Sequence, residues 1–101
     1  MIDSAAFRRL ALALPGTIEI THFDRLAYRR RVIFASLARD GATANMRLPP
    51  ERQVDLIDRF PHVLQRVDNK WGDRGWSTIR LGCTTETDLA HLLALAHEAA
   101  A

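Results

Sequence analysis

Cysteine and lysine are scarce in this sequence, and each shortage narrows what the protein can be. The single cysteine, Cys83, excludes an internal disulfide and a metal cage built from cysteines, and it fits a reducing cytoplasm best. No apolar run approaches the roughly 20 residues that cross a bilayer. We therefore expect a cytoplasmic protein that is neither a disulfide scaffold nor a membrane protein.

Positive charge is present but modest. The 14 basic residues include one lysine, Lys70, and the formal net charge at pH 7 is +2. Strong electrostatic DNA binders usually carry a larger basic field, so this excess permits weak phosphate contacts without requiring them. With 48% hydrophobic and 26% charged residues in 101 positions, the composition is that of one small soluble domain.

The N-terminal segment MIDSAAFRRLALALPG is predicted as an amphipathic helix. It is not typical of a secretory signal, because Arg8 and Arg9 interrupt its apolar residues and Asp3 precedes them. The helix is expected over about residues 4–14, before Pro15-Gly16. Its apolar stripe follows helical spacing and consists of Phe7, Leu10, Ala11 and Leu14.

Alternating apolar residues then predict strands. In TIEITHF, Ile18 and Ile20 share the face expected to be buried, and His22, in the same register, is expected to be partly buried. Turn signals at Arg30-Arg31 and Asp40-Gly41 divide the next stretch into three antiparallel strands. These strands are expected at about residues 26–29, 32–38 and 42–48.

The second half of the chain predicts two more helices and a fifth strand. A helix is expected over about residues 50–60, with Val54, Ile57 and Phe60 buried and Arg52, Asp55 and Arg59 facing water. Residues 62–75 are predicted as a loop with a short strand at its start, and WSTIRL as a strand. Thr85 and Asp88 form a capping box for the last helix, whose inward residues are Leu89, Leu92, Leu93 and Ala96.

This order of elements predicts an α+β two-layer sandwich in a single domain over residues 1–101. About three helices are expected to cover one face of an antiparallel sheet of four to five strands. The other face is expected to stay open to solvent, as antiparallel sheets allow.

Both tryptophans and the only lysine lie within the stretch NKWGDRGW. Trp76 shares its strand register with Thr78 and Arg80, so it is expected on the open face if that strand pairs with the Thr43-Asn45-Arg47 strand. Such a face could stack a base, a sugar or a peptide aromatic and hold an anion. The alternative, favoured by the usual burial of tryptophan, is that Trp76 folds over a sheet edge beneath the 69–75 loop.

Trp71 is expected to anchor that loop, with Gly72 and Gly75 supplying backbone freedom. A second basic feature is the Arg29-Arg30-Arg31 hairpin tip, which could contact a phosphate backbone. Its alternative is a solvated hairpin end whose charges prevent wrong edge pairing.

No combination of residues predicts catalysis, a metal or a cofactor. His22 lacks a paired serine, cysteine or carboxylate, and Glu19 lies on the opposite side of its strand. His91 and His97 are six residues apart on a helix, which is the wrong spacing for one metal. Cys83 has no neighbouring partner. An enzyme would require a deep pocket with polar groups converging around His22.

The stretches LALALPGTIEITHF, YRRRVIFASL and NKWGDRGWSTIRL, in that order, resemble the MmcQ/YjbR family of small bacterial proteins, formerly a domain of unknown function. The resemblance runs from about Phe7 to Ala96. The matching positions are Leu14-Pro15-Gly16, Glu19, His22-Phe23, Phe34-Ala35, Trp71-Gly72 and Gly75-Trp76.

The resemblance implies an α+β fold similar to CyaY with wing-like hairpins, and DNA binding is the function commonly suggested for the family. It implies no catalytic residue or cofactor. One departure is that Arg30 and Arg31 stand where the family usually has glycine and often lysine, so we expect a longer loop or another turn type here. Arg8 and Arg9 replace the acidic helix of CyaY, which argues against iron binding.

We therefore expect a cytoplasmic, monomeric, non-enzymatic module that binds DNA weakly and loses affinity as salt rises. The residues expected to contact DNA are Arg29, Arg30, Arg31, Arg47, Lys70, Arg74, Trp76 and Arg80. The alternative is a protein-binding or small-ligand-binding domain that uses the Trp76 face.

Overall fold

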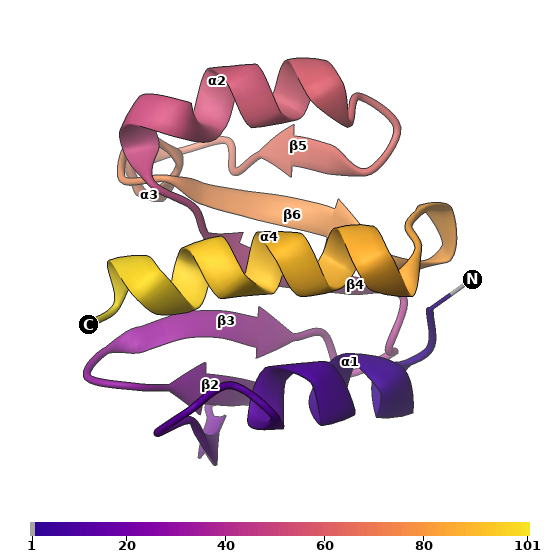
Figure 1. The fold of residues 1–101 in the computed structure, drawn as a ribbon, viewed down its shortest axis with the longest axis vertical. Helices are drawn as coiled ribbons and strands as arrows, with labels where there is room; N and C mark the ends of the chain where they lie inside the picture. The colour runs from indigo at the N-terminus through magenta and orange to yellow at the C-terminus, as the bar shows by residue number, and fades with distance from the viewer. Residues whose placement is uncertain (1) are drawn as a thin grey trace.

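One antiparallel sheet of six strands forms the back of the molecule, and α1, α2 and α4 lie in front of it (Figure 1). The computed structural model describes residues 2–101. The elements are α1 (Ser4–Leu12), β1 (Ile18–His22), β2 (Arg25–Arg29), β3 (Ile33–Leu37), β4 (Thr43–Arg47), α2 (Pro50–Arg59), β5 (Leu64–Arg66), α3 (Lys70–Asp73), β6 (Trp76–Arg80), η1 (Leu81–Cys83) and α4 (Glu86–Ala99). The predicted α+β architecture with one open sheet face is confirmed.

The strand order is β1-β2-β3-β4-β6-β5. The first four strands form a meander, and α2 then carries the chain to the far edge, where β5 forms. The last strand, β6, returns between β4 and β5, antiparallel to both. The sheet therefore has one strand more than the largest number predicted.

Side-chain caps and glycine turns set the helix ends. The Asp3 carboxylate accepts a hydrogen bond from the Ala6 amide at 2.8 Å and begins α1. The helix ends at Leu12, two residues earlier than predicted, and the turn that follows places Gly16 at a φ of +72°. At α4, the Thr85 hydroxyl accepts from the Asp88 amide at 3.2 Å, which confirms the predicted cap.

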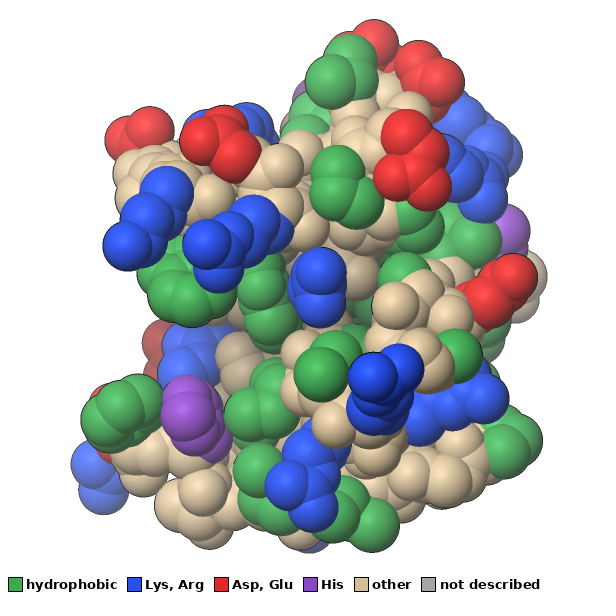
Figure 2. All heavy atoms as spheres, turned by 90° about the vertical axis from the view of Figure 1, so that its left-hand side faces the viewer, with side chains coloured by type: hydrophobic (Ala, Val, Ile, Leu, Met, Phe, Trp, Pro, Cys, Tyr) green, Lys and Arg blue, Asp and Glu red, His purple; other side chains and the backbone are tan. Residues whose placement is uncertain are grey.

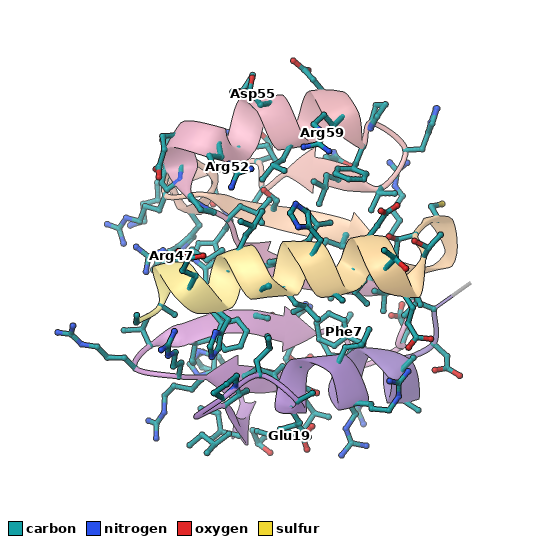
Figure 3. The ribbon with its side chains drawn as sticks, in the orientation of Figure 1. Phe7, Glu19, Arg47, Arg52, Asp55 and Arg59 are labelled. Carbon is teal, nitrogen blue, oxygen red and sulfur yellow. The ribbon has the colours of Figure 1, made fainter. Side chains whose placement is uncertain are left out.

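The core lies between the sheet and the helical layer. The four residues of α4 predicted to face inward are all buried: Leu89, Leu92, Leu93 and Ala96. From α1, Phe7 points between that helix and α4 (Figure 3) and meets the Tyr28 ring edge-on, with centroids 5.6 Å apart. Both rings are fully buried, so this contact joins α1 to the centre of the sheet.

The buried face of α2 differs from the prediction. Val54 is 70% exposed, whereas Gln53 and Leu56 are buried and Ile57 and Phe60 are partly buried. Residues 53, 56, 57 and 60 follow helical i, i+3, i+4, i+7 spacing, and Val54 falls outside that stripe. Gln53 is accommodated because its Nε2 donates to the Trp76 carbonyl at 3.2 Å and to the Ser77 hydroxyl at 3.0 Å.

The first strand has the opposite orientation to the one predicted. Glu19 pairs across the ladder with Tyr28, so it faces the helices, while Ile18 and His22 are exposed. The Glu19 carboxylate accepts from Arg8 Nε at 2.9 Å and from the Tyr28 hydroxyl at 2.8 Å. An ion pair with α1 therefore occupies the inner position that the apolar alternation assigned to isoleucine.

Two connections extend the predictions. The β2–β3 hairpin uses the three-residue loop 30–32, none of which has positive φ, so the expected departure from a tight primed turn is confirmed. The short strand expected after residue 62 is β5, but the helical turn α3 was not predicted.

Among residues 2–101, no helix has the length and hydropathy needed to span a membrane.

Candidate functional site: a basic, aromatic hollow in the open sheet face

The open face combines side chains from every part of the sheet. The condition under which Trp76 was expected on this face is met: β4 pairs with β6, and the register places Arg47 beside Trp76 and Asn45 beside Thr78. Ser36 of β3 lies beside Asn45 on the same face. Because α1, α2 and α4 cover the other face, these side chains line a surface that remains accessible (Figure 1).

This face contains a hollow of about 550 Å³. Seen from the side, it is a notch at the left of the molecule, with basic and hydrophobic side chains on its upper wall and a histidine on its lower wall (Figure 2). The hollow is lined by His22, Arg25, Ile33, Ser36, Asn45, Arg47, Val67, Asn69, Trp71, Arg74 and Trp76. Its size falls within the range of about 300–1,000 Å³ that is typical of small-ligand sites.

The loop around α3 builds the upper wall and is held by close backbone approach. A Cβ on Gly72 would lie 2.0 Å from the Val67 carbonyl oxygen, and one on Gly75 would lie 1.8 Å from that of Leu48. Gly75 also has a φ of +101°. Asn69 begins α3 by accepting from the Trp71 amide at 2.9 Å. Only glycine fits the two close contacts, and they fix the position of α3 against the sheet.

Trp76 does not take the alternative position over a sheet edge. It lies on β6, an interior strand, and its ring is partly buried in the hollow. Trp71, which was expected to anchor the loop, is 47% exposed. The Arg74 guanidinium lies over the Trp71 ring, 5.0 Å from its centroid.

The lining is electropositive. It contains Arg25, Arg47, Arg74 and His22, and no aspartate or glutamate. Within the described residues 2–101, the salt bridges join Arg8 to Glu19, Arg9 to Glu86 and Arg66 to Asp73, and none involves a lining arginine. The charge of the hollow is therefore not neutralised by the protein itself.

The polar groups of the hollow present donors rather than acceptors. Ser36 Oγ accepts from Arg25 Nε at 3.1 Å, and Asn45 Oδ1 accepts from the Thr78 hydroxyl at 2.9 Å. Asn69 Oδ1 is used by the Trp71 amide. Arg25 also donates to the Ser36 carbonyl at 3.5 Å, so the further donors of the hollow are the Asn45 amide NH₂ and the guanidinium groups of Arg47 and Arg74. This arrangement suits an anion beside an aromatic ring.

The three arginines of the β2–β3 hairpin, Arg29, Arg30 and Arg31, differ in their contacts. All three are exposed residues, but Arg30 Nη1 donates to the His97 carbonyl at 3.1 Å and lies 3.4 Å from His97 Nδ1. His97 Nε2 lies 2.6 Å from the Pro15 carbonyl oxygen, which can only accept, so the proton is on Nε2 and Nδ1 accepts from Arg30. Arg30 thus binds the C-terminal end of α4.

Of the predicted site residues, the hollow brings together Arg47, Arg74 and Trp76. Lys70 and Arg80 are exposed and lie outside the lining, and Arg80 Nη2 donates to Gln65 Oε1 at 3.5 Å. The residues not predicted include His22, Arg25 and Trp71. For His22 the missed signal was strand register: with β1 in its correct orientation, His22 faces the hollow and not the core.

Other chemistry-bearing residues lie outside the hollow. Cys83 is exposed, and residues 2–101 contain no cluster of three histidine, cysteine, aspartate or glutamate side chains that could hold a metal ion. The Arg8 hydrogen bond holds the pKa of Glu19 below its usual value of 4.5, and the Tyr28 hydroxyl adds to this effect. Burial, with the Glu19 hydrogen bond, raises the pKa of Tyr28. This cluster lies under α1 and stabilises the fold.

A family model described as YjbR matches residues 12–99. The chain belongs to the YjbR family. The YjbR fold is also found in the crystal structure of Deinococcus radiodurans protein DR2400, a DUF419 domain, with a TM-score of 0.77. That likeness covers 95% of this chain and 77% of DR2400 at 19% sequence identity, so it bears on the fold alone. No curated protein matches the chain. The resemblance stated from the sequence is confirmed.

Proposed function

We propose that this YjbR protein is a non-enzymatic module that binds DNA weakly through its open sheet face. The observation that supports this proposal is the hollow, which gathers three arginines and two tryptophans without a carboxylate. DNA contains a partner for each kind of side chain, because its phosphates pair with guanidinium groups and its bases stack on indole rings.

A binding role suits the lining better than catalysis. His22 is present, but no carboxylate, cysteine or second histidine lines the hollow to form a catalytic pair with it. The lining serine, Ser36, already accepts a hydrogen bond from Arg25. Outside the hollow, Arg29 and Arg31 at the hairpin tip, together with Lys70 and Arg80, would extend the phosphate contacts.

The test is a salt titration of fluorescently labelled oligonucleotides, followed by anisotropy. We expect weak binding near 50 mM salt that falls steeply by about 200 mM, because few phosphates are neutralised. Replacing both Arg47 and Arg74 by alanine should weaken binding at least about tenfold. The matched control replaces Arg52 and Arg59, two exposed arginines on α2 in the helical layer (Figure 3), and should bind as the wild type does. Absence of binding even near 50 mM salt would refute DNA binding.

The volume of the hollow supports a second candidate, a small anionic aromatic ligand. The same donors would hold its carboxylate or phosphate, and the indole rings would stack on its ring. Indole fluorescence that responds to such a metabolite but not to oligonucleotides would favour this function over DNA binding.

A further inference from the structure

We infer that the hollow takes unpaired nucleotides, so that the protein prefers single-stranded DNA to duplex DNA. This inference rests on the proposed DNA binding and specifies the form of the nucleic acid. It depends on three features: an exposed indole held in place, donors that match a phosphate and a base edge, and a recess that a paired base cannot enter.

The exposed indole is Trp71. Large aromatic side chains are usually mostly buried, yet 47% of Trp71 remains exposed although Arg74 lies over its ring. An indole backed by a guanidinium group resembles the stacking platforms of proteins that bind single strands, where each base contributes through its flat face.

The platform is fixed before any ligand arrives. Gly72 packs against the Val67 carbonyl oxygen, and Arg66 of β5 forms an ion pair with Asp73 of α3. The amide of Trp71 is itself hydrogen-bonded to the Asn69 side chain. These contacts fix the backbone that carries the indole, and the Arg74 guanidinium lies against the ring itself, so less conformational entropy is lost when a base stacks on it.

The donors of the hollow match one nucleotide. Arg47 and Arg74 form no salt bridge within residues 2–101 and so can neutralise a phosphate. The Asn45 amide nitrogen can donate to a base edge, because its oxygen is taken by Thr78. In duplex DNA the bases are stacked inside the helix and must be flipped out to reach such a recess, whereas a single strand presents them directly.

A second aromatic residue lies at the rim. Phe23 is 88% exposed, and its ring centroid lies 4.7 Å from that of His22, which lines the hollow. It has a φ of +58° at the first position of a two-residue turn, where glycine is preferred. A side chain in that conformation is strained. An exposed and strained aromatic beside the hollow is consistent with a second stacking position.

The experiment compares three labelled probes of about ten nucleotides on the full chain near 50 mM salt: a single strand, the blunt duplex of the same sequence, and an abasic strand. The abasic strand keeps the phosphates and lacks the bases. We expect the single strand to bind at least about fivefold more tightly than either of the others, since stacking distinguishes it. Quenching of indole fluorescence should accompany only the single strand.

Variants assign the preference to Trp71. Trp71→Ala should weaken binding of the single strand more than binding of the abasic strand and so remove most of the difference between them, while Trp71→Phe should retain part of that difference. Equal binding of the three probes, or a preference for duplex, would overturn the inference and leave DNA binding standing. If none of the probes binds, DNA binding and the inference both fail.

Discussion

At the scale of single residues, Glu19 shows how a charged side chain can occupy an inner strand position. Its carboxylate accepts hydrogen bonds from Arg8 and from Tyr28, whose ring is buried beneath α1. Figure 3 shows Glu19 on the side of α1 away from Phe7, at the margin of the helical layer. The ion pair between Glu19 and Arg8 therefore covers the edge of the core that α1 itself does not cover.

This arrangement predicts a loss of stability in acid. Because hydrogen bonding lowers the pKa of Glu19 below 4.5 in the folded state, its contribution is complete above that value. It is lost as the pH falls through 4.5 towards the folded pKa. Glu19→Gln should lower the free energy of unfolding by roughly 1 kcal/mol at neutral pH, with solvent screening at the half-exposed Arg8 keeping the effect small.

Urea unfolding of both proteins at about pH 7 and about pH 3 measures this difference. The difference between the two stabilities should be smaller at the lower pH, because the contribution of the lowered Glu19 pKa is lost as the pH falls below 4.5. A gap of the same size at both values would show that Glu19 acts through packing and not through its charge.

At the scale of elements, the C-terminal end of α4 is held by hydrogen bonds to residues that are distant in the sequence. Arg30, in the loop between β2 and β3, donates to the His97 carbonyl, and His97 donates to the Pro15 carbonyl. Three segments far apart in the sequence meet at this point. The positive charge of Arg30 also lies near the negative, C-terminal end of the helix dipole, which is a favourable interaction.

Arg30 and its neighbour Arg31 provide a matched test of this hydrogen bond to α4. Arg30→Ala should destabilise the protein by about 1 kcal/mol, because a carbonyl of the last helical turn loses a charged donor. The expected decrease in melting temperature is about 4–8 °C, followed by circular dichroism. Arg31→Ala should change stability by less than about 0.5 kcal/mol, since Arg31 is exposed like Arg30 but its side chain forms no hydrogen bond or salt bridge within residues 2–101. Equal effects of the two substitutions would contradict the assignment.

The elements that could be predicted from the sequence are those defined by local chemistry. The stop signal at Pro15-Gly16 predicted the end of α1 to within two residues, and the Thr85 cap predicted where α4 begins. The alternation of β4 and β6 predicted which side chains face solvent, because both strands carry clearly polar and clearly apolar positions. These signals require no knowledge of distant contacts.

The errors arose where distant contacts decide the outcome. Ile18 and Ile20 alternate as a buried face would, but the pairing of Glu19 with Arg8 and Tyr28 turns β1 over. Val54 is apolar, yet the contacts of α2 with β5 and β6 select the stripe containing Gln53. The hollow could be predicted only in part for the same reason, because five strands and α3 contribute its walls.

At the scale of the whole molecule, stability and recognition are separated into two layers. The apolar core and the Arg8–Glu19 and Arg9–Glu86 ion pairs support the helical side of the sheet, whereas the hollow in the open face gathers Arg25, Arg47 and Arg74 without a carboxylate in its lining. Like charges held in one hollow repel each other, so these arginines contribute little to folding unless an anion is bound. A ligand that binds only the folded state should therefore raise the melting temperature.

Arg47 provides the test of this separation. Without ligand, Arg47→Ala should unfold within about 1 kcal/mol of the wild type, because removing one of three clustered cations relieves repulsion. With a single-stranded oligonucleotide at about 100 times its Kd, the wild type should gain about 2.7 kcal/mol and melt about 11–22 °C higher. The variant should show little of this increase at the same oligonucleotide concentration. Scanning calorimetry of both proteins, with and without oligonucleotide, measures the two effects. If Arg47→Ala melts far below the wild type without ligand, Arg47 is needed for stability and the separation fails. If the variant keeps the full increase with oligonucleotide, Arg47 is not a binding residue.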